Sequence, residues 1–402
     1  MRLKIFNKEE RMTFRSRIIS ILFCVLYIGM LASVFVSCSK ESGEEATKQT
    51  TPAKISKVTK KKSPLEKWKP DFNPKTAEYK CIVSNVSHPA IKGVYAGFAI
   101  RDELWKRTNG RIYLDYKPFS MLGGEVEVLN QLQMGAIQGM SCSSVASTNL
   151  GPRFGLVNLP FLINSFDKLD KFIAVQDQKL FNHFLMSMDH QGIMALDITG
   201  YGNYGWASTT PIKSIYDAKK VKFRTAEAAV NQLLYKTWGF NAVVMPWPDV
   251  PIALKQGVIE GLDHAPTVCS LTKKFDVCKY FTQINYAQGL FIWLFNKTWF
   301  NSLPEDLQEI FKDVVHEVCA DIRKQSKQQE LAQIQAAKDK GIEFFKLSDQ
   351  EITKLKKQAN AVHSKYADEI NKLYDGDIYR PKNYLRTVQF YMGYSPLHKQ
   401  DD

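Results

Sequence analysis

The sequence lacks the short motifs that mark the common hydrolases and nucleotide-dependent enzymes. It contains no GxSxG elbow, no phosphate-binding loop and no HExxH pair, because His316-Glu317 has no histidine at position 320. Its seven histidines are scattered, and His183 and His190, seven residues apart near an expected helix end, are read as ordinary polar residues. The missing motifs favour a binding protein over an enzyme, and we expect no catalytic residue, cofactor or metal.

One glycine pattern does match a nucleotide-binding motif. Residues 200–205 read GYGNYG, which fits GxGxxG, and an expected strand precedes them. The following residues, WASTTP (206–211), are partly β-branched and end in proline, so they are not expected to form a helix. A dinucleotide site needs a helix N-terminus to hold the pyrophosphate. We therefore reject this interpretation.

Paired cysteines are also lacking. Beyond Cys38 the chain has five cysteines, an odd number without CxxC spacing, which argues against both a disulfide framework and a zinc site. Cys81 and Cys319 stand in apolar patterns and are expected to be buried as small hydrophobic side chains. A bridge between Cys269 and Cys278 is the alternative that remains open.

Acidic residues are in deficit: 54 lysines and arginines against 41 aspartates and glutamates give a formal net charge of +13. The excess is concentrated at the start of the chain, where residues 1–37 have a net charge of +4 and residues 38–70 one of +5. The rest of the chain has a net charge of only +4. That is an ordinary protein surface, so we expect no nucleic-acid partner.

The N-terminus is organised like an export signal. A basic segment ends at Arg17, residues 18–36 are uncharged and apolar, and Ser37-Cys38 is followed by a polar run. The pattern resembles a bacterial lipoprotein signal, in which the cysteine is lipidated and becomes the first mature residue, although Phe35 stands where leucine is usual. We therefore predict a signal peptide over 1–37, lipidation of Cys38, and a periplasmic, membrane-anchored lipoprotein of the bacterial cell envelope.

An uncleaved anchor is the alternative, because the nineteen apolar residues of 18–36 are enough to span a bilayer. Met12 begins a more conventional signal and is a second candidate for the start of the protein. Residues 38–70 are rich in lysine, serine, threonine and proline. They are predicted to form a flexible basic tether, which either lies near anionic lipid headgroups or is simply solvated.

Helices and strands alternate along the rest of the chain, which indicates α/β layers with a largely parallel sheet. Strands are expected at 79–83, 111–116, 140–144, 193–198 and 289–295, and helices at 88–108, 122–135, 165–188, 302–340 and 348–374. Capping boxes at Ser302 and Ser348 begin the last two helices. The first of these would be about 55 Å long at 1.5 Å per residue, so it should cross between two domains. Residues 376–402 form a tail without a clear period.

Residues 221–264 contain the candidate binding site. A strand ending at Phe223, a helix over 226–238 and a strand over 242–245 form a βαβ unit. Open α/β sheets bind ligands at the carboxyl ends of their strands, where Arg224 stands. Its planar guanidinium can pair with both oxygens of a carboxylate. A surface arginine in a structural ion pair is the alternative.

Five segments together resemble the substrate-binding proteins of tripartite ATP-independent periplasmic (TRAP) transporters. In order they are LGGEVEVLNQLQMG (122–135), LPFL (159–162), KFRT (222–225), MPWPDVPIALKQGVIEG (245–261) and LPEDLQ (303–308). Each segment is weak alone, but their order and spacing are similar to those of the family over about residues 79–375. The resemblance implies that a ligand binds in a closing interdomain cleft and is delivered to permease subunits in the membrane.

The fold implied by the resemblance is α/β, a two-domain periplasmic-binding-protein-like fold with crossing hinge strands and a long helix spanning both domains. We expect domain I at 78–201 and 290–329, and domain II at 202–289 and 330–375. Arg224 falls on the family's signature arginine, which pairs with the substrate carboxylate. The other residues expected at the ligand, each with a packing or capping role as the alternative, are Ser84, Asn85, Glu125, Ser143, Tyr204, Trp206, Trp247, Asp263 and His264.

Two departures from the family pattern bear on the ligand. Many members have a second arginine where this chain has Tyr204, and Asp263-His264 stand where the family usually has asparagine. Tyr201, Tyr204, Trp206 and Trp247 are expected to make the pocket more aromatic and less cationic than a dicarboxylate or sialic-acid site. We therefore expect a monocarboxylate with an apolar or aromatic-compatible body. A metal held by Asp263 is a less favoured alternative.

The sequence thus predicts a lipid-anchored extracytoplasmic solute-binding protein that binds a small organic acid through an arginine salt bridge and delivers it to a TRAP permease. A ligand-sensing lipoprotein of the same fold, which signals to a partner and does not feed transport, is the second hypothesis. An exported enzyme on this scaffold is the third.

Overall fold

A computed structural model describes residues 64–371 and 384–395 of the chain. The predicted signal peptide, the lipidation site at Cys38 and the predicted tether as far as residue 63 lie outside these ranges. The tether was expected to reach residue 70, but its end is packed against the folded part. The ring of Trp68, in η1 (Glu66–Trp68), stacks on that of Phe98 with 5.6 Å between centroids, and the Arg101 guanidinium donates to the Trp68 carbonyl across 2.7 Å. The packed chain therefore begins before residue 70.

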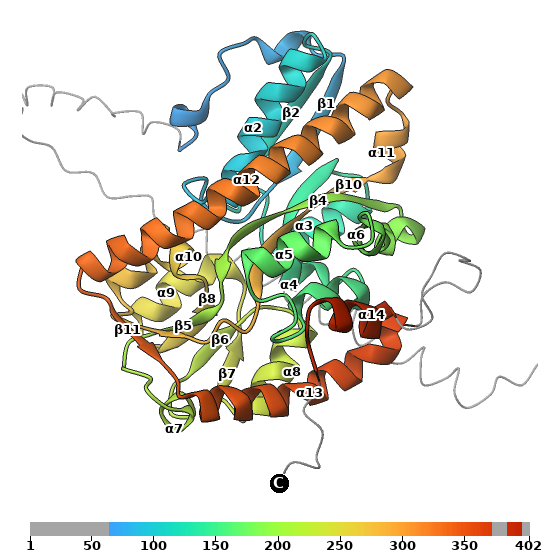
Figure 1. Ribbon diagram of the computed structural model, residues 1–402. Helices are drawn as coiled ribbons and strands as arrows, with labels where there is room; N and C mark the ends of the chain where they lie inside the picture. Colours follow the sequence, from blue (N-terminus) through green and yellow to red (C-terminus); the bar gives the residue numbers. More distant parts are fainter. Residues whose placement is uncertain (1–63, 372–383, 396–402) are drawn as a thin grey trace, which may run out of the picture. The chain divides into compact units, whose positions relative to one another are not determined.

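Five strands form sheet A in the order β2-β1-β3-β10-β4 (Figure 1). Their bounds are β1 (Tyr79–Ser84), β2 (Ile112–Lys117), β3 (Gly139–Ser143), β4 (Ile193–Asn203) and β10 (Gln288–Asn296). β1 pairs in parallel with β2 and β3, whereas β10 is antiparallel to β3 and β4. All of β10 except its last residue is buried. Both faces of this strand are covered, which explains its unbroken apolar sequence.

Six strands form sheet B in the order β11-β9-β5-β8-β6-β7. Their bounds are β5 (Gly205–Ser208), β6 (Phe223–Thr225), β7 (Ala242–Val244), β8 (Gly261–His264), β9 (Tyr280–Gln283) and β11 (Glu343–Lys346). β6 is parallel to β7 and β8, and β5 is antiparallel to β8 and β9. Each sheet thus has one strand that runs against its neighbours, and the expected largely parallel pairing holds for the others.

The chain crosses between the sheets twice at one place. β4 ends in sheet A at Asn203, and the chain passes through Tyr204 into β5 of sheet B, while residues 284–287 return from β9 to β10. The two crossings are hydrogen-bonded to each other: the Tyr204 N–H donates to the Ala287 carbonyl, and the Asn285 N–H donates to the Tyr204 carbonyl, each across 2.9 Å. These segments are the crossing strands that the sequence predicted.

A long helix, α12 (Glu305–Asp339), joins the layers of both sheets. Figure 1 shows it in orange, and it packs against α2 (Lys92–Arg107), β4 and α10 (Pro266–Leu271). Its contacts with α2 extend from Glu317 to Gln329. Close to the crossing, the Glu330 carboxylate accepts the Asn203 N–H across 2.6 Å. The predicted helix that spans both domains is therefore present, and the two-domain α/β fold is confirmed.

The remaining helices surround the two sheets. They are α3 (Glu125–Gln133), α4 (Ser144–Ser147), α5 (Phe166–Ala174), α6 (Lys179–Leu185), α7 (Ile215–Ala218), α8 (Ala229–Trp238), α9 (Val250–Lys255), α11 (Lys297–Asn301), α13 (Asp349–Asn371) and α14 (Tyr384–Tyr391), with 3-10 turns η2 (Pro74–Thr76), η3 (Pro152–Asn158), η4 (Met186–Gln191), η5 (Trp247–Asp249) and η6 (Lys274–Asp276). None of the helices in the described ranges has an apolar stretch suited to crossing a bilayer.

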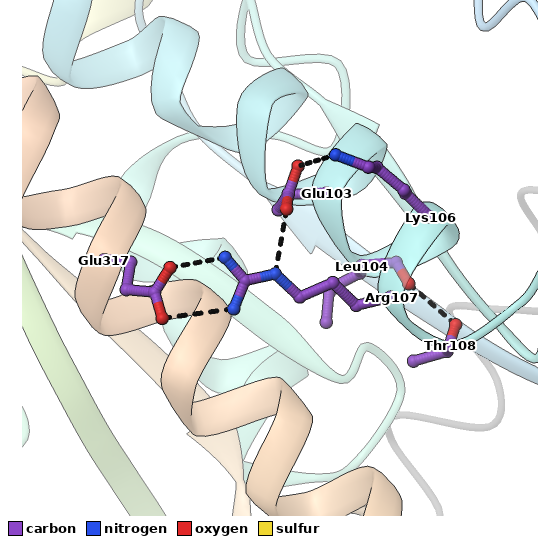
Figure 2. Close-up of polar contacts among 6 residues, drawn as sticks. All are labelled: Glu103, Leu104, Lys106, Arg107, Thr108 and Glu317. Carbon is purple, nitrogen blue, oxygen red and sulfur yellow. Dashed lines mark hydrogen bonds and ion pairs between the residues drawn. The ribbon is translucent and has the colours of Figure 1, made fainter.

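Figure 2 shows how α2 is joined to α12 on the surface. The Arg107 guanidinium donates through both terminal nitrogens to the two carboxylate oxygens of Glu317, and its Nε donates to Glu103 across 2.8 Å. These carboxylates raise the pKa of Arg107. More than half of the Glu317 side chain, 59%, is exposed, so solvent weakens this pair despite its two-point geometry.

Several predicted boundaries were wrong. The helix expected over 165–188 is broken between α5 and α6, where Gln176, Asp177 and Gln178 all have positive φ. The capping box at Ser302 is absent, because Pro304 is the N-cap of α12 and the Ser302 hydroxyl donates to Trp299 instead. The box at Ser348 is confirmed by reciprocal hydrogen bonds with Glu351. The tail expected to lack a period contains α14.

The glycine-rich segment 200–205 runs from β4 through Tyr204 into β5, and no helix follows it directly, in agreement with the rejection of a dinucleotide motif. Packing explains two of its glycines. A Cβ at Gly200 would lie 2.5 Å from the Phe166 ring, and one at Gly202 would lie 2.8 Å from Glu330. Gly202 also has φ of +121°, which side chains disfavour. The glycines thus permit close packing at the crossing between the sheets.

The five cysteines of the described chain are all buried and free. Burial raises the pKa of the Cys278 thiol to about 12 and raises that of Cys269 further. The expected burial of Cys81 and Cys319 is confirmed, and the alternative of a Cys269–Cys278 bridge is not present in this structure.

Candidate functional site

Arg224 is the central cation of a cleft between the two sheets. It is the middle residue of β6, not the residue after the strand, because the pairing with β7 and β8 extends further than the apolar run indicates. Only 6% of the residue is exposed. Its Nε donates to the Met245 carbonyl across 2.9 Å, and its other N–H groups have no hydrogen-bond or ion-pair partner among the described residues.

The cleft that Arg224 enters is narrow, with a cavity of about 40 Å³. Its walls come from both sheet layers, which agrees with the predicted interdomain position. Seven of the ten residues expected at the ligand line it, namely Glu125, Ser143, Tyr204, Arg224, Trp247, Asp263 and His264. The same cavity is lined by Val86, Ser87, Val145, Tyr201, Ala226, Asn231 and Phe291.

The charge of Arg224 is set by burial and by nearby acids. Burial lowers its pKa, while the charges of Asp263 and Glu125 act in the opposite direction. An arginine starts so far above neutrality that it remains protonated in proteins. The cleft therefore holds a permanent cation with unused donors, which is the arrangement that a carboxylate ligand requires.

Asp263, at the end of β8, is held by two donors. Its Oδ2 accepts the Tyr286 hydroxyl across 2.6 Å and the Asn231 side-chain amide across 3.2 Å. Burial raises its pKa to about 6, although both donors and Arg224 favour the ionised form. The carboxyl group thus titrates close to neutral pH.

Glu125 lines the same cleft from the other layer. It begins α3, and its two oxygens accept the backbone N–H and the hydroxyl of Ser143, each across 2.7 Å. Ser143 in turn caps α4 by accepting the Ala146 N–H. Burial raises the pKa of Glu125 more than these bonds lower it. Glu125 and Ser143 were both expected at the ligand, and their mutual bonds fix this wall of the cleft.

Aromatic rings close the rest of the cleft. The hydroxyls of Tyr201 and Tyr204 are hydrogen-bonded across 2.6 Å. The His264 ring lies beside both tyrosines and 4.8 Å from that of Trp247, measured between centroids. The Arg224 guanidinium lies 5.7 Å from the centroid of the Trp247 ring. Tyr201, Tyr204 and Trp247, three of the four aromatic residues expected in the pocket, thus line the cleft.

His264 is a neutral donor in this setting. Burial and the charges of Arg224 and Lys274 lower its pKa well below the usual value. Its Nδ1 accepts the N–H of Ala265 across 3.0 Å, which assigns the ring proton to Nε2. The ring can therefore donate one hydrogen bond to a ligand.

Three residues expected at the ligand do not line the cavity. The Ser84 hydroxyl donates to the Lys117 carbonyl, and the Asn85 amide donates to the Ser141 carbonyl across 2.7 Å while its oxygen accepts the Ser87 N–H. Both are buried and serve the end of β1. Trp206 is fully buried among Phe223, Trp238 and Phe240.

The cleft also contains residues that sequence reasoning missed. Asn231 lies in the first turn of α8, where a polar residue after the Arg224 strand was an available signal, because that helix end faces the same sheet edge. Ser87 follows β1 by three positions and was passed over in favour of Ser84 and Asn85. The small apolar residues Val145 and Ala226 have no signal that separates them from core residues.

Asp263→Asn is expected to change how stability depends on pH. Because burial raises the Asp263 pKa from 3.8 to about 6, the folded protein binds this proton more tightly than the unfolded chain. The free energy of unfolding of the wild type should then fall as pH rises through this window, by up to about 3 kcal/mol from this group. The variant lacks that fall. Urea unfolding at pH 4, 5, 6 and 7 checks it, and parallel curves for the two proteins would contradict it.

Comparison with known proteins shows which family this chain resembles. The family model for bacterial extracellular solute-binding proteins, family 7, matches residues 84–369. A relative, the 2,3-diketo-L-gulonate-binding periplasmic protein YiaO of Escherichia coli (strain K12), is 26% identical over 248 residues, which cover 61% of this chain and 74% of that protein. The C4-dicarboxylate-binding periplasmic protein DctP of Rhodobacter capsulatus is 26% identical over 267 residues, 66% of this chain and 79% of that protein.

Solved structures agree on the fold. A TRAP periplasmic solute-binding protein from Desulfovibrio salexigens with bound orotic acid has a TM-score of 0.71 to this chain at 20% identity, covering 78% of this chain and 99% of that one. The family match extends over well over half of the sequence and includes β6 with Arg224. This chain therefore belongs to bacterial extracellular solute-binding protein family 7, the family of TRAP solute-binding proteins.

Proposed function

We propose that this protein binds a small organic acid, with Arg224 as the carboxylate anchor, and delivers it to the membrane subunits of a TRAP permease. The observation that supports the anchor is a buried guanidinium that lines the cleft, donates one N–H to the Met245 carbonyl and has its other N–H groups available to a ligand. A buried charge without a partner is costly. A ligand carboxylate supplies that partner through two parallel charge-assisted hydrogen bonds.

The other walls suggest how the ligand is oriented. Nε2 of His264 offers one further donor, and the indole of Trp247 offers an apolar face beside Arg224. Asp263 and Glu125 are acceptors and repel a second ligand anion at this depth. Hydroxyl groups of the ligand are suitable partners for these two carboxylates. We infer an acid whose first carboxylate lies on Arg224 and whose neighbouring carbons carry hydroxyl or apolar groups.

The ligands of the relatives support this class. The proteins from Escherichia coli and Rhodobacter capsulatus bind 2,3-diketo-L-gulonate and C4-dicarboxylates, and the Desulfovibrio salexigens structure contains orotic acid. All of these are carboxylic acids. Lipidation of Cys38 would keep the protein at the membrane, next to the permease. Binding and delivery of the acid require no catalytic step by this chain.

The full-length protein should be stabilised by its ligand. We expect at least one small organic acid to raise the melting temperature, because a ligand present at a hundred times its Kd adds about 2.7 kcal/mol to the free energy of unfolding. A thermal-shift screen of organic acids, combined with mass spectrometry of small molecules that co-purify, measures this. The proposal fails if no acid shifts the melting temperature and no acid is retained.

A further inference from the structure

A second cavity adjoins the Arg224 cleft. This outer chamber has a volume of about 380 Å³ and shares Val86, Ser87 and Trp247 with the cleft. Its other lining residues are His88, Phe119, Ser120, Pro248, Pro251, Leu271, Thr272, Lys273 and Lys274. The walls come from the loops after β1 and β2 on one side and from η5, α9 and the end of α10 on the other. The chamber therefore lies between the two sheet layers, as the cleft does.

The chamber differs from the cleft in charge. The cleft contains Glu125 and Asp263 beside Arg224. The lining of the chamber contains two lysines and a histidine and no aspartate or glutamate. The His88 Nδ1 accepts the Ala90 N–H across 2.9 Å, so the ring proton is on Nε2. The ionisable side chains that line this space are thus donors, which favours an anion there.

Lys274 is the least expected of these residues. It begins η6, and only 5% of it is exposed. Its ammonium nitrogen lies 4.3 Å from the centroid of the Trp247 ring, and within the described chain it has no hydrogen-bond or ion-pair partner. Trp247 therefore has two buried cations near its ring, Arg224 from the cleft and Lys274 from the chamber.

The contact with the Trp247 ring does not by itself explain why the Lys274 ammonium is buried. A cation–π contact offers some stabilisation, but it leaves the three N–H donors of the ammonium without an acceptor. A buried ammonium normally has an ionic or hydrogen-bonded partner, because the loss of hydration is costly. The Arg224 guanidinium in the cleft shows the same combination of burial and unused donors.

We propose that Lys274 forms a second anion subsite, which receives a second carboxylate of the ligand on the outer side of Trp247. The ligand is then a dicarboxylic acid, with one end on Arg224 in the cleft and the other on Lys274 in the chamber. The sequence alone favoured a monocarboxylate, and this proposal differs from that expectation because it takes the buried Lys274 into account. The inference rests on the proposed function, since it takes the Arg224 anchor as given.

Matched pairs of acids test the subsite with the full-length protein. The probes are malonate, succinate, glutarate and adipate, each compared with the straight-chain monocarboxylate of the same carbon number by isothermal titration calorimetry at pH 7. We expect at least one dicarboxylate to bind the wild type about tenfold or more tightly than its partner, as a hydrogen-bonded charge pair implies. In Lys274→Met this preference should fall to within about twofold.

Lys273→Met is the matched control, because Lys273 lines the same chamber but is exposed, so it should keep the wild-type preference. Lys274→Gln provides a second neutral variant should the methionine variant fold poorly. A Lys274 variant that folds and retains the wild-type preference overturns the subsite, as does a wild type that binds no dicarboxylate more tightly than its partner. A different outcome would contradict the role of Arg224 and not that of Lys274. In that outcome Lys274→Met loses the preference for dicarboxylates, but Arg224→Met binds the acids as tightly as the wild type.

The pH profile of the wild type gives a readout that needs no variant. Burial and the charge of Arg224 lower the pKa of Lys274 to about 8, so the dicarboxylate preference should decline between pH 8 and 9 as the ammonium loses its proton. The groups around it keep their charge state in that range: the pKa values of His88 and His264 are lowered, and those of Cys269 and Cys278 are raised. Lys273, at the rim, is tested by its own variant. A preference that stays constant to pH 9 would contradict the proposal.

Discussion

Arg224→Met should weaken binding of the organic-acid ligand by about a hundredfold or more. Truncating one partner of a buried, hydrogen-bonded charge pair costs about 2–5 kcal/mol, and each 1.4 kcal/mol is a factor of ten in Kd. In the free protein the same change removes one hydrogen bond, from Nε to the Met245 carbonyl, and one buried charge. Folding should therefore survive while binding is lost. Calorimetric titration with the acid found by the thermal-shift screen measures the change.

Arg224→Lys is the matched control for charge. It retains a cation in β6 but lacks the planar fork, so it should recover part of the affinity and bind less tightly than the wild type. Both variants should also raise the pKa of Asp263 further when the cation is removed or displaced, because the charge of Arg224 favours the ionised carboxylate. Wild-type affinity in Arg224→Met would remove this residue from the site.

The order of short motifs predicted Arg224, which lines the cleft in the structure, but local patterns misplaced part of its surroundings. Arg224 and Trp247 could be predicted because each belongs to a segment whose spacing resembles that of a family. Ser84 and Asn85 were chosen for their positions at the end of a strand and Trp206 for its aromatic ring, and neither feature determines the direction in which a side chain points. In the structure Asn85 bonds to β3 and Trp206 packs into an aromatic cluster.

Lys274 was missed for a related reason. In the sequence it is one of two adjacent lysines, Lys273-Lys274, and a pair of this kind is usually solvated. Only the turn at Lys273, with φ of +61°, sends the first lysine outward while the second begins η6 and is buried. A residue whose environment depends on a left-handed backbone conformation cannot be assigned from hydrophobic periodicity.

Helix lengths were predicted correctly where the apolar stripe is continuous. They were predicted wrongly where a helix is broken at residues other than glycine or proline. α12 followed its stripe from Leu307 to Ile322 and was found at nearly its predicted length. The break between α5 and α6 falls at Gln176, Asp177 and Gln178, none of which is a strong helix breaker. We attribute the break to the packing of α5 and α6, whose buried faces include Phe172 and Phe181.

The attachment of α12 to β4 depends on a buried carboxylate. Asp197 in β4 accepts a hydrogen bond from the Arg323 guanidinium across 2.7 Å, and its other oxygen is 2.9 Å from Nδ1 of His316. The Arg323 guanidinium also donates to the Ile198 carbonyl across 2.8 Å. The side chains of Asp197 and Arg323 are only 4% and 10% exposed. This pair is therefore buried, in contrast to the exposed pair between Arg107 of α2 and Glu317 of α12.

Asp197→Ala should lower the free energy of unfolding by about 3–5 kcal/mol, because it leaves the buried guanidinium of Arg323 without its counter-charge. Glu317→Gln, which breaks the exposed pair of Figure 2, should cost about 1 kcal/mol or less. Urea unfolding of the three proteins at pH 7 measures both. The double variant Asp197→Leu with Arg323→Met should regain much of the loss, since replacing both charges by apolar groups removes the unpaired ion. Equal losses for Asp197→Ala and Glu317→Gln would mean that burial does not set the strength of these pairs, and the long helix would then be held to β4 by its apolar contacts alone.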